Sequence, residues 1–461
     1  MARPDFQGGY GRLGYSTLYG RLLNEGPYGA LELGLDVLKP VSADDPWATV
    51  RVRMEGGSLP GTDGFGASLA QFRVSQFHVE AGNLLGPALT FRLGTLVYFY
   101  GDLGLYDVRP ATLFDETLGL SAQFRSEFVD VLVGFGDSGF FLKGAQYSPI
   151  LTAGAGVRVR LGGHLEFGAG GQVGVEPFVE GSKNSSYVTP GIVYADYLRK
   201  EVVQRFFESN PGPDSLFPRV SPSAVPNFNY RAVGYMGFGK LGPLKWNSSF
   251  VAFRRLHPEL STTETFQGRD YTLYIADLTR DRYRFVAGNE MLLSLWPERL
   301  DLAWSVMLTD DANLANAIQA GEDNRRTYST VLRLQLYLTR AVHVLLESSL
   351  AQERSKNGNL FRTRSDSVFR STGGQADTRG LEFGDSAVRN TWQMKSGLVL
   401  NPTGFGIYAR PAIRLLYGFQ YSTQNAAWPN GFVDSLSQFN EFPSADRRWH
   451  HVISLEAEGW F

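Results

Sequence analysis

The sequence LRLQLYL, residues 332–338, decides the fold because apolar and polar side chains alternate throughout it. Its leucines are separated by Arg333, Gln335 and Tyr337. Successive side chains of a β-strand point to opposite faces, so a strand here has one apolar face and one polar face. A helix would need apolar residues at three- and four-residue spacing, so the stretch predicts a β-strand.

The same two-residue period recurs along the chain and predicts an all-β protein. It is clear at residues 30–37, 50–55 and 453–461. A soluble β-protein with a ligand pocket would turn its apolar faces inward. A transmembrane barrel turns them toward lipid and keeps the polar faces around a wet lumen. Alternation alone leaves both interpretations open.

Three features favour the transmembrane barrel. The expected strands are long, often nine residues or more. Aromatic residues gather near expected strand ends, at residues 10–19 and 98–100, as in the girdles of membrane proteins at the lipid–water interface. The chain also closes on a strand that ends in Phe461. We therefore predict a transmembrane antiparallel β-barrel of about 18 strands in the lipid of a bacterial outer membrane.

The expected connections alternate in length. Short ones lie at residues 162–163, 241–243, 296–299, 339–340 and 401–403, and long ones near 199–226, 257–270, 309–325, 354–385 and 422–447. Outer-membrane barrels have short periplasmic turns and long extracellular loops, and we expect the same here. Residues 197–208 suggest a short loop helix. No change in composition marks a boundary, so residues 1–461 are predicted to form a single domain.

The composition gives no support for a nucleic-acid partner, a metal site or an enzyme. Lys and Arg number 44 against 46 Asp and Glu, and nucleic-acid binding needs a basic surface instead. The chain has no cysteine, which excludes thiol catalysis and thiolate metal ligands. Its six histidines show neither metal-ligand spacing nor a convincing Ser–His or Asp–His constellation. We predict no catalytic residue, no metal and no cofactor; a barrel phospholipase or protease is the enzyme alternative.

Both ends of the chain resemble one known family. Residues 407–415, IYARPAIRL, resemble the penultimate strand of the maltoporins (LamB-type), with its aromatic-x-Arg-Pro-Ala-Ile-Arg core. Residues 454–461, SLEAEGWF, are similar to the ending of that family, a tryptophan followed by a terminal aromatic residue. Residues 6–12, FQGGYGR, are similar to its opening Phe-His-Gly-Tyr-x-Arg, with one extra glycine. The resemblance covers roughly the first 85 and last 130 residues of the chain.

The resemblance implies a fold, a function and partners. Maltoporins are 18-stranded barrels that assemble as homotrimers. They let maltose and maltodextrins diffuse passively and selectively through the outer membrane, so the implied substrate is an oligosaccharide. The terminal aromatic residue of such barrels is recognised by the barrel-assembly machinery during insertion, which implies the same role for Phe461.

The resemblance also implies a lane of aromatic side chains along which sugars slide. Sugar rings stack on flat aromatic faces, and weak, repeated binding lets them leave as well as enter. The matching residues are Tyr10, Tyr28, Tyr408 and Trp460. Each of them shares its expected strand face with charged residues, so lipid contact does not explain them. Strands at the two ends of the chain are neighbours in a closed barrel, and we expect Tyr10 and Tyr408 to flank Trp460.

Charged residues along the lane would bind the sugar hydroxyls. The planar guanidinium group of arginine offers two parallel donors and keeps its charge. The residues implied for this role are Arg12, Arg21, Arg73, Arg410 and Arg414. Phe99 and Asp102 are the best matches to the constriction of the family.

Two departures from the family put maltodextrin specificity in question. Residues 84–107, which would fold inward as the constriction, form a shorter segment than in maltoporins, and Ala30 replaces a lining carboxylate. We therefore expect a wider constriction and a different sugar preference. The alternative is a general diffusion porin without a specific sugar site.

Overall fold

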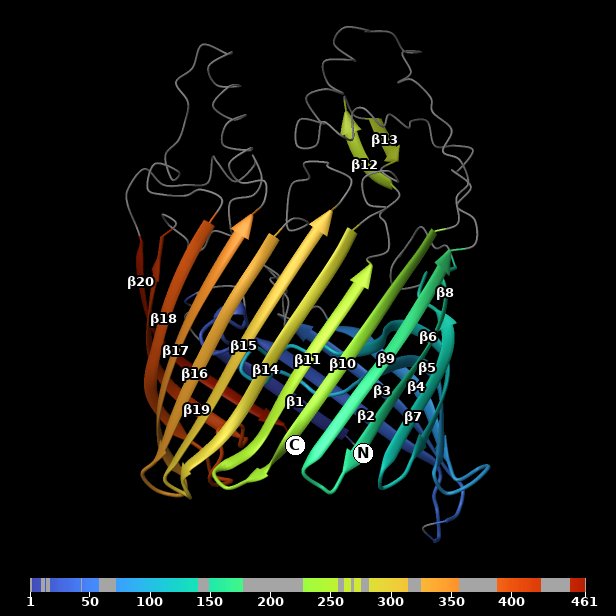
Figure 1. Ribbon diagram of the computed structural model, residues 1–461, viewed down its shortest axis with the longest axis horizontal. Coiled ribbons are helices and arrows are strands. Elements are labelled where there is room, and N and C mark those ends of the chain that lie inside the picture. Colours follow the sequence, from blue (N-terminus) through green and yellow to red (C-terminus); the bar gives the residue numbers. More distant parts are fainter. Residues whose placement is uncertain are drawn as a thin grey trace, which may run out of the picture.

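The structure is a computed structural model that describes most of the chain (Figure 1). It describes residues 2–9, 13, 17–42, 44–57, 72–139, 149–176, 227–255, 261–266, 269–274, 282–313, 325–355, 388–423 and 448–460. In this part of the chain no helix is both long and apolar enough to cross a membrane.

Eighteen strands form one antiparallel sheet. They are β1 (Ala2–Gly9), β2 (Tyr28–Leu38), β3 (Trp47–Gly57), β4 (Phe72–Gly82), β5 (Leu89–Phe99), β6 (Thr112–Arg125), β7 (Val129–Asp137), β8 (Leu151–Leu161), β9 (Leu165–Glu176), β10 (Asn227–Leu241), β11 (Leu244–Arg255), β14 (Arg282–Trp296), β15 (Leu300–Asn313), β16 (Arg325–Tyr337), β17 (Val342–Ser355), β18 (Val388–Leu400), β19 (Ala412–Ser422) and β20 (Trp449–Trp460). A separate hairpin, β12 (Ser261–Phe266) with β13 (Arg269–Tyr274), belongs to the connection between β11 and β14.

The sheet closes on itself. Each strand pairs with its neighbour along the chain, and β1 pairs with both β2 and β20. Phe6, for example, lies opposite Gly29 on one side and Gly459 on the other. Closure leaves no open edge, so the strands satisfy one another's backbone groups around the whole ring. The prediction of an antiparallel barrel of about 18 strands is confirmed.

Alternation along the strands separates an apolar outer face from a polar inner one. In β16, Leu332 and Leu336 are exposed on the outside, whereas Arg333 and Gln335 are buried inside. In β20, Ile453 and Leu455 are exposed and Ser454 is buried. Exposed large apolar residues occur on strands all around the ring. A soluble barrel has the reverse arrangement, and a membrane barrel has this one.

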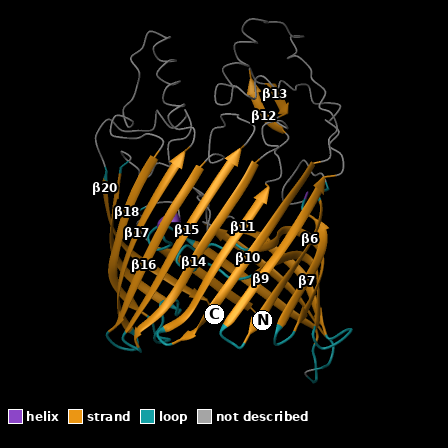
Figure 2. Cartoon of the chain, viewed as in Figure 1, coloured by secondary structure: helices purple, strands orange, loops and turns teal. Residues whose placement is uncertain are grey.

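Short connections gather at one end of the barrel (Figure 2). The predicted turns at 162–163, 241–243, 296–299 and 339–340 all join consecutive strands there. The prediction for 401–403 is wrong, because the connection runs on to residue 411 before β19 begins. The helix suggested for 197–208 lies outside the described residues.

Aromatic side chains also line the outside of β18, β19 and β20. Trp449 packs against Phe419 and Tyr421, with ring centroids 5.9 and 4.9 Å apart. Trp392 packs edge-on against Phe419, and its indole N–H donates to Ser348 Oγ at 3.1 Å. Aromatic rings with one polar atom suit the interface between lipid and water.

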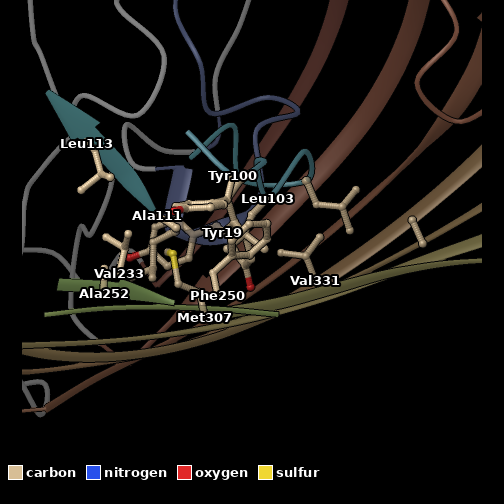
Figure 3. Packing of buried hydrophobic residues seen from close by; sticks show 14 of the residues in the cluster. Tyr19, Tyr100, Leu103, Ala111, Leu113, Val233, Phe250, Ala252, Met307 and Val331 are labelled. Carbon is tan, nitrogen blue, oxygen red and sulfur yellow. The ribbon is translucent and has the colours of Figure 1, made fainter. Parts of the chain in front are cut away.

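The lumen is partly filled by three segments of chain, residues 17–25, 100–111 and 401–411. The first contains a short 3₁₀ helix, η1 (Thr17–Tyr19). Apolar residues of the first two, including Leu103 and Tyr106, pack against inward-facing Phe250, Met307 and Val331 of the wall (Figure 3).

The interfacial positions expected for four aromatic residues are therefore wrong, and two of these residues, Tyr98 and Phe99, line a cavity inside the barrel. Tyr19 and Tyr100 are buried in the apolar cluster inside the barrel, not at its outer rim. Their side chains pack against apolar residues of the inner wall, which removes them from water as effectively as lipid would.

Candidate solute-binding cavity

A cavity of about 1500 Å³ lies between the inward segments and the wall formed mainly by β2 to β8. Its lining includes eleven arginines, Arg21, Arg51, Arg53, Arg73, Arg92, Arg109, Arg125, Arg158, Arg160, Arg254 and Arg410. Nine carboxylates accompany them, Glu32, Glu55, Glu80, Asp102, Asp107, Asp115, Asp130, Glu290 and Glu458. The lining therefore carries many charged groups, but its net charge is close to zero.

Ion pairs within β3 and between neighbouring strands engage all four arginines on the β2 to β5 wall. Arg51 Nη1 lies 3.5 Å from Glu32 Oε1, and Arg92 Nη2 lies 3.6 Å from Glu80 Oε1. Glu55 receives both Arg53 at 3.3 Å and Arg73 at 3.6 Å. Alternate residues of adjacent strands face the same side, which brings these groups together. Arg73 remains largely exposed to the cavity.

Tyr28 stands in this row of charges. Its hydroxyl accepts a hydrogen bond from Arg53 Nη2 at 2.7 Å and donates to Glu55 Oε2 at 3.2 Å. The side chain is buried but still contributes to the cavity lining. The structure thus places Tyr28 in the lumen beside arginine and carboxylate groups.

Tyr408 reaches the cavity by a different route from the one that strand alternation predicts. It belongs to the connection 401–411, so the alternation argument is wrong for Tyr408 and for Arg410. Its hydroxyl donates to Glu290 Oε1 at 2.8 Å, and its ring centroid lies 6.3 Å from that of Trp246. Burial raises the pKa of the Tyr408 phenol well above its ordinary value, so the hydroxyl stays a donor.

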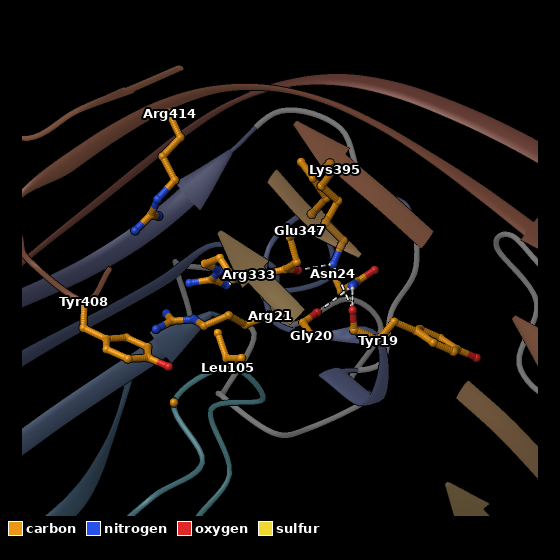
Figure 4. Close-up of polar contacts among 12 residues, drawn as sticks. Tyr19, Gly20, Arg21, Asn24, Leu105, Arg333, Glu347, Lys395, Tyr408 and Arg414 are labelled. Carbon is orange, nitrogen blue, oxygen red and sulfur yellow. Dashed lines mark hydrogen bonds and ion pairs between the residues drawn. The ribbon is translucent and has the colours of Figure 1, made fainter. Parts of the chain in front are cut away.

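Three of the arginines named from the sequence converge on one carboxylate. Arg21 and Arg414 each approach Glu458 to 2.7 Å, and Arg410 also pairs with it. Arg21 and Arg410 line the cavity, and Arg414 on β19 is buried; Figure 4 shows Arg21 and Arg414. Glu458 accepts hydrogen bonds from their guanidinium groups, so fewer N–H groups remain to bind a solute.

Phe99 and Asp102 both line the cavity at the point where β5 passes into the inward segment 100–111. The Arg109 guanidinium lies over the Phe99 ring, 4.3 Å from its centroid. Tyr10 and Arg12 lie outside the described residues. Of Trp460 the structure describes the backbone, which pairs with Asp5 of β1.

The other half of the lumen is closed by buried charges. Glu347 pairs with Arg333 at 2.6 Å and with Lys395 at 2.8 Å, and Lys395 also donates to the backbone carbonyl of Tyr19 (Figure 4). The Tyr19 hydroxyl donates to Glu353 at 2.5 Å. These bonds fasten residues 17–25 to β16, β17 and β18.

Several lining residues escaped sequence reasoning. The alternation in residues 157–160, VRVR, was a usable signal for Arg158 and Arg160. No sequence pattern indicates a role for Trp246 or Glu290, because both contact inward segments that are distant from them in the sequence. In the described residues no group of three His, Asp or Glu side chains could hold a metal ion.

Comparison with known proteins gives structural similarity at low sequence identity. No protein-family model matches the chain, and no curated protein matches it. OprD of Pseudomonas aeruginosa aligns with 100% of this chain and 93% of its own length, at 9% identity and a TM-score of 0.42. OpdL of Pseudomonas aeruginosa covers 100% and 98%, at 10% identity and 0.42. An anion-selective porin from Comamonas acidovorans covers 77% and 89%, at 10% identity and 0.38.

These values are too low to assign the chain to a family or to transfer a function to it. None of the three structures is a maltoporin, and the maltoporin resemblance stays a prediction.

Proposed function

We propose that this protein is a passive channel of the bacterial outer membrane for small polar solutes. One observation carries the proposal: a closed barrel exposes apolar side chains outside and encloses a charged cavity. Leu35, Leu93 and Ile453 are 67%, 61% and 74% exposed on the outer face. Removing apolar surface from water is favourable by about 25 cal/mol per Å², so a lipid bilayer would stabilise such a face.

Sugars are the solutes that the lining supports best. Arginine and carboxylate side chains in nearly equal number offer donors and acceptors for hydroxyl groups without a large net charge. The rings of Tyr28, Tyr98, Phe99, Trp246 and Tyr408 also face the cavity and supply surfaces for stacking. Selective passage of oligosaccharides is thus our proposal. Assembly as a homotrimer and insertion by the barrel-assembly machinery are proposals that rest on the maltoporin resemblance.

Current block in planar lipid bilayers tests sugar selectivity. Linear oligosaccharides of increasing length should reduce the ion current through the purified protein in a saturable way, because a bound sugar occupies the cavity. Mannitol serves as a hydroxyl-rich control without a sugar ring. Current that falls only in proportion to solution viscosity would favour a general diffusion porin instead.

Small organic anions are the second candidate, because some arginines have no carboxylate partner. Among the described residues, Arg109, Arg125 and Arg158 make no ion pair. Arg125 and Arg158 lie opposite Asp130 on either side of β7, but Asp130 pairs with Arg160 at 2.5 Å. Block by glucuronate at concentrations where glucose has no effect would favour this candidate over neutral sugars.

A further inference from the structure

Glu290 of β14 joins two inward segments that are about three hundred residues apart in the sequence. Its Oε1 accepts hydrogen bonds from the Gly104 N–H at 3.0 Å and from the Tyr408 hydroxyl at 2.8 Å. Its Oε2 accepts from the Leu105 N–H at 2.9 Å. The side chain is 1% exposed and makes no ion pair with any cation in the described residues. Three donors therefore satisfy a buried carboxylate without a salt bridge.

The two segments touch at this point. A Cβ atom added to Gly104 would lie 2.9 Å from Tyr408 Cε1 and 3.3 Å from Glu290 Oε1. Only glycine lets the backbone come this close to the Tyr408 ring. Small shifts of the carboxylate would thus move both segments against each other.

Residues on either side of these contacts face the solute. Segment 100–111 brings Asp102, Asp107 and Arg109 to the cavity, and segment 401–411 brings Tyr408 and Arg410. The Tyr408 ring is also held against Trp246 of β11. Glu290 therefore sits where the position of several candidate solute contacts is set.

Other contacts keep both segments inside the barrel when Glu290 changes. Leu103, Leu105 and Tyr106 are fully buried, and the Tyr106 hydroxyl bonds to Ser329 Oγ at 3.1 Å. In the second segment, the Gly406 carbonyl accepts a hydrogen bond from Gln335 Nε2 of β16 at 3.4 Å. A substitution at Glu290 should shift the segments without expelling them.

We propose that Glu290 is a positioning residue that fixes the two inward segments relative to each other and thereby sets the affinity of the channel for its solute. The effect on solute affinity rests on the proposed function, whereas the effect on the accessibility of segment 100–111 does not. Glutamine is the informative replacement, because its amide cannot present two acceptors. In one orientation its NH₂ group faces the Leu105 N–H, and in the other it faces the Gly104 N–H and the Tyr408 hydroxyl, so at least one donor loses its acceptor.

The first test compares sugar affinity in the wild type, Glu290→Gln, Tyr408→Phe and the double variant. Each single change should weaken saturable block about three- to tenfold, the effect of one net hydrogen bond. The two effects should not multiply in the double variant, because both remove the same contact. Ion conductance without sugar should stay near the wild-type value. Tyr417→Phe is the matched control: its hydroxyl hydrogen-bonds to His451 Nδ1 at 2.9 Å on the outer face of the barrel, and the sugar affinity of this variant should not change.

The second test does not depend on a sugar, or on conduction. The chain lacks cysteine, so a single cysteine reports local accessibility. Val108→Cys on segment 100–111 should react faster with a thiol reagent when Glu290→Gln is also present. Thr90→Cys on β5, which also lines the cavity but does not belong to an inward segment, should react at an unchanged rate. Heat-dependent gel mobility in detergent confirms that each variant is folded.

The outcomes separate the two proposals. A wild-type channel without saturable sugar block, combined with faster modification at position 108 in the Glu290→Gln background, would overturn sugar selectivity and leave the positioning role standing. Unchanged modification rates at position 108 would overturn the positioning role, as would effects of Glu290→Gln and Tyr408→Phe that multiply.

Discussion

At the scale of the residue, buried charge is concentrated around Glu458, where two inward segments meet the barrel wall. Glu458 receives Arg21, Arg410 and Arg414, which come from two inward segments and from β19. A carboxylate with three cations around it holds these separate parts of the chain at one place. Removing one partner of such a group leaves charge buried without compensation.

Glu458→Gln should therefore destabilise the barrel by about 3–5 kcal/mol, the usual cost of breaking a buried ion pair. The temperature at which the detergent-solubilised protein loses its folded gel mobility measures this change. Glu32→Gln is the control, since Glu32 is partly exposed and its pairs with Arg51 and Arg53 are 3.5 and 3.7 Å long. The control should cost about 1 kcal/mol or less. Equal losses in the two variants would contradict a special role for Glu458.

Lumen positions could be predicted where local alternation fixes the direction of a side chain, and the maltoporin resemblance also pointed to Arg21, Phe99 and Asp102, which line the cavity. Tyr28 faces the lumen because it lies on a regular strand beside the charged residues of β3. Tyr408 also reaches the lumen, but through a connection that no periodicity describes. The role of Glu290 depends on backbone donors from residues 104 and 105, and sequence patterns cannot place those.

At the scale of the element, the inward segments divide the lumen into an open and a closed half. Residues 17–25 are fastened to β16 by Ser329, to β17 by Glu353 and to β18 by Lys395. The cavity lies on the other side, against β2 to β8. A solute path should therefore follow only the second side.

Single cysteines can map this division in a chain that has none of its own. Gln123→Cys on β6 lines the cavity and should react readily with a charged thiol reagent. Ser349→Cys on β17 also points inward but is 1% exposed, and should react slowly as long as the protein is folded. Mass spectrometry of the modified protein gives both rates. Similar rates at the two positions would show that residues 17–25 do not seal the lumen.

The strands could be predicted from the sequence, whereas of the inward segments only part of 100–111 was expected, through the maltoporin resemblance of residues 84–107. Two-residue alternation fixes a strand and its two faces because backbone geometry imposes that period. It does not say whether an apolar side chain meets lipid or a segment inside the barrel. Val331 and Met307 face inward and pack against Leu103 and Tyr106, and their sequence pattern is the same as that of lipid-facing residues.

At the scale of the whole molecule, the closed ring and its apolar outer face support one central claim, our proposal that the protein lets polar solutes cross a membrane. The barrel has no open edge, and its strands are joined by short turns at one end. Charged groups line the cavity within, and their nearly balanced number favours neutral, hydroxyl-rich solutes. The binding sites and inward segments matter for transport only if this claim holds.

Osmotic swelling of liposomes that contain the purified protein tests the claim most directly. In isotonic solutions of neutral sugars, the liposomes should swell, fastest for monosaccharides and progressively more slowly for longer linear oligosaccharides. Swelling should not occur in isotonic dextran too large to enter a cavity of about 1500 Å³. Liposomes that carry correctly folded protein but swell in glucose no faster than protein-free liposomes would contradict the account.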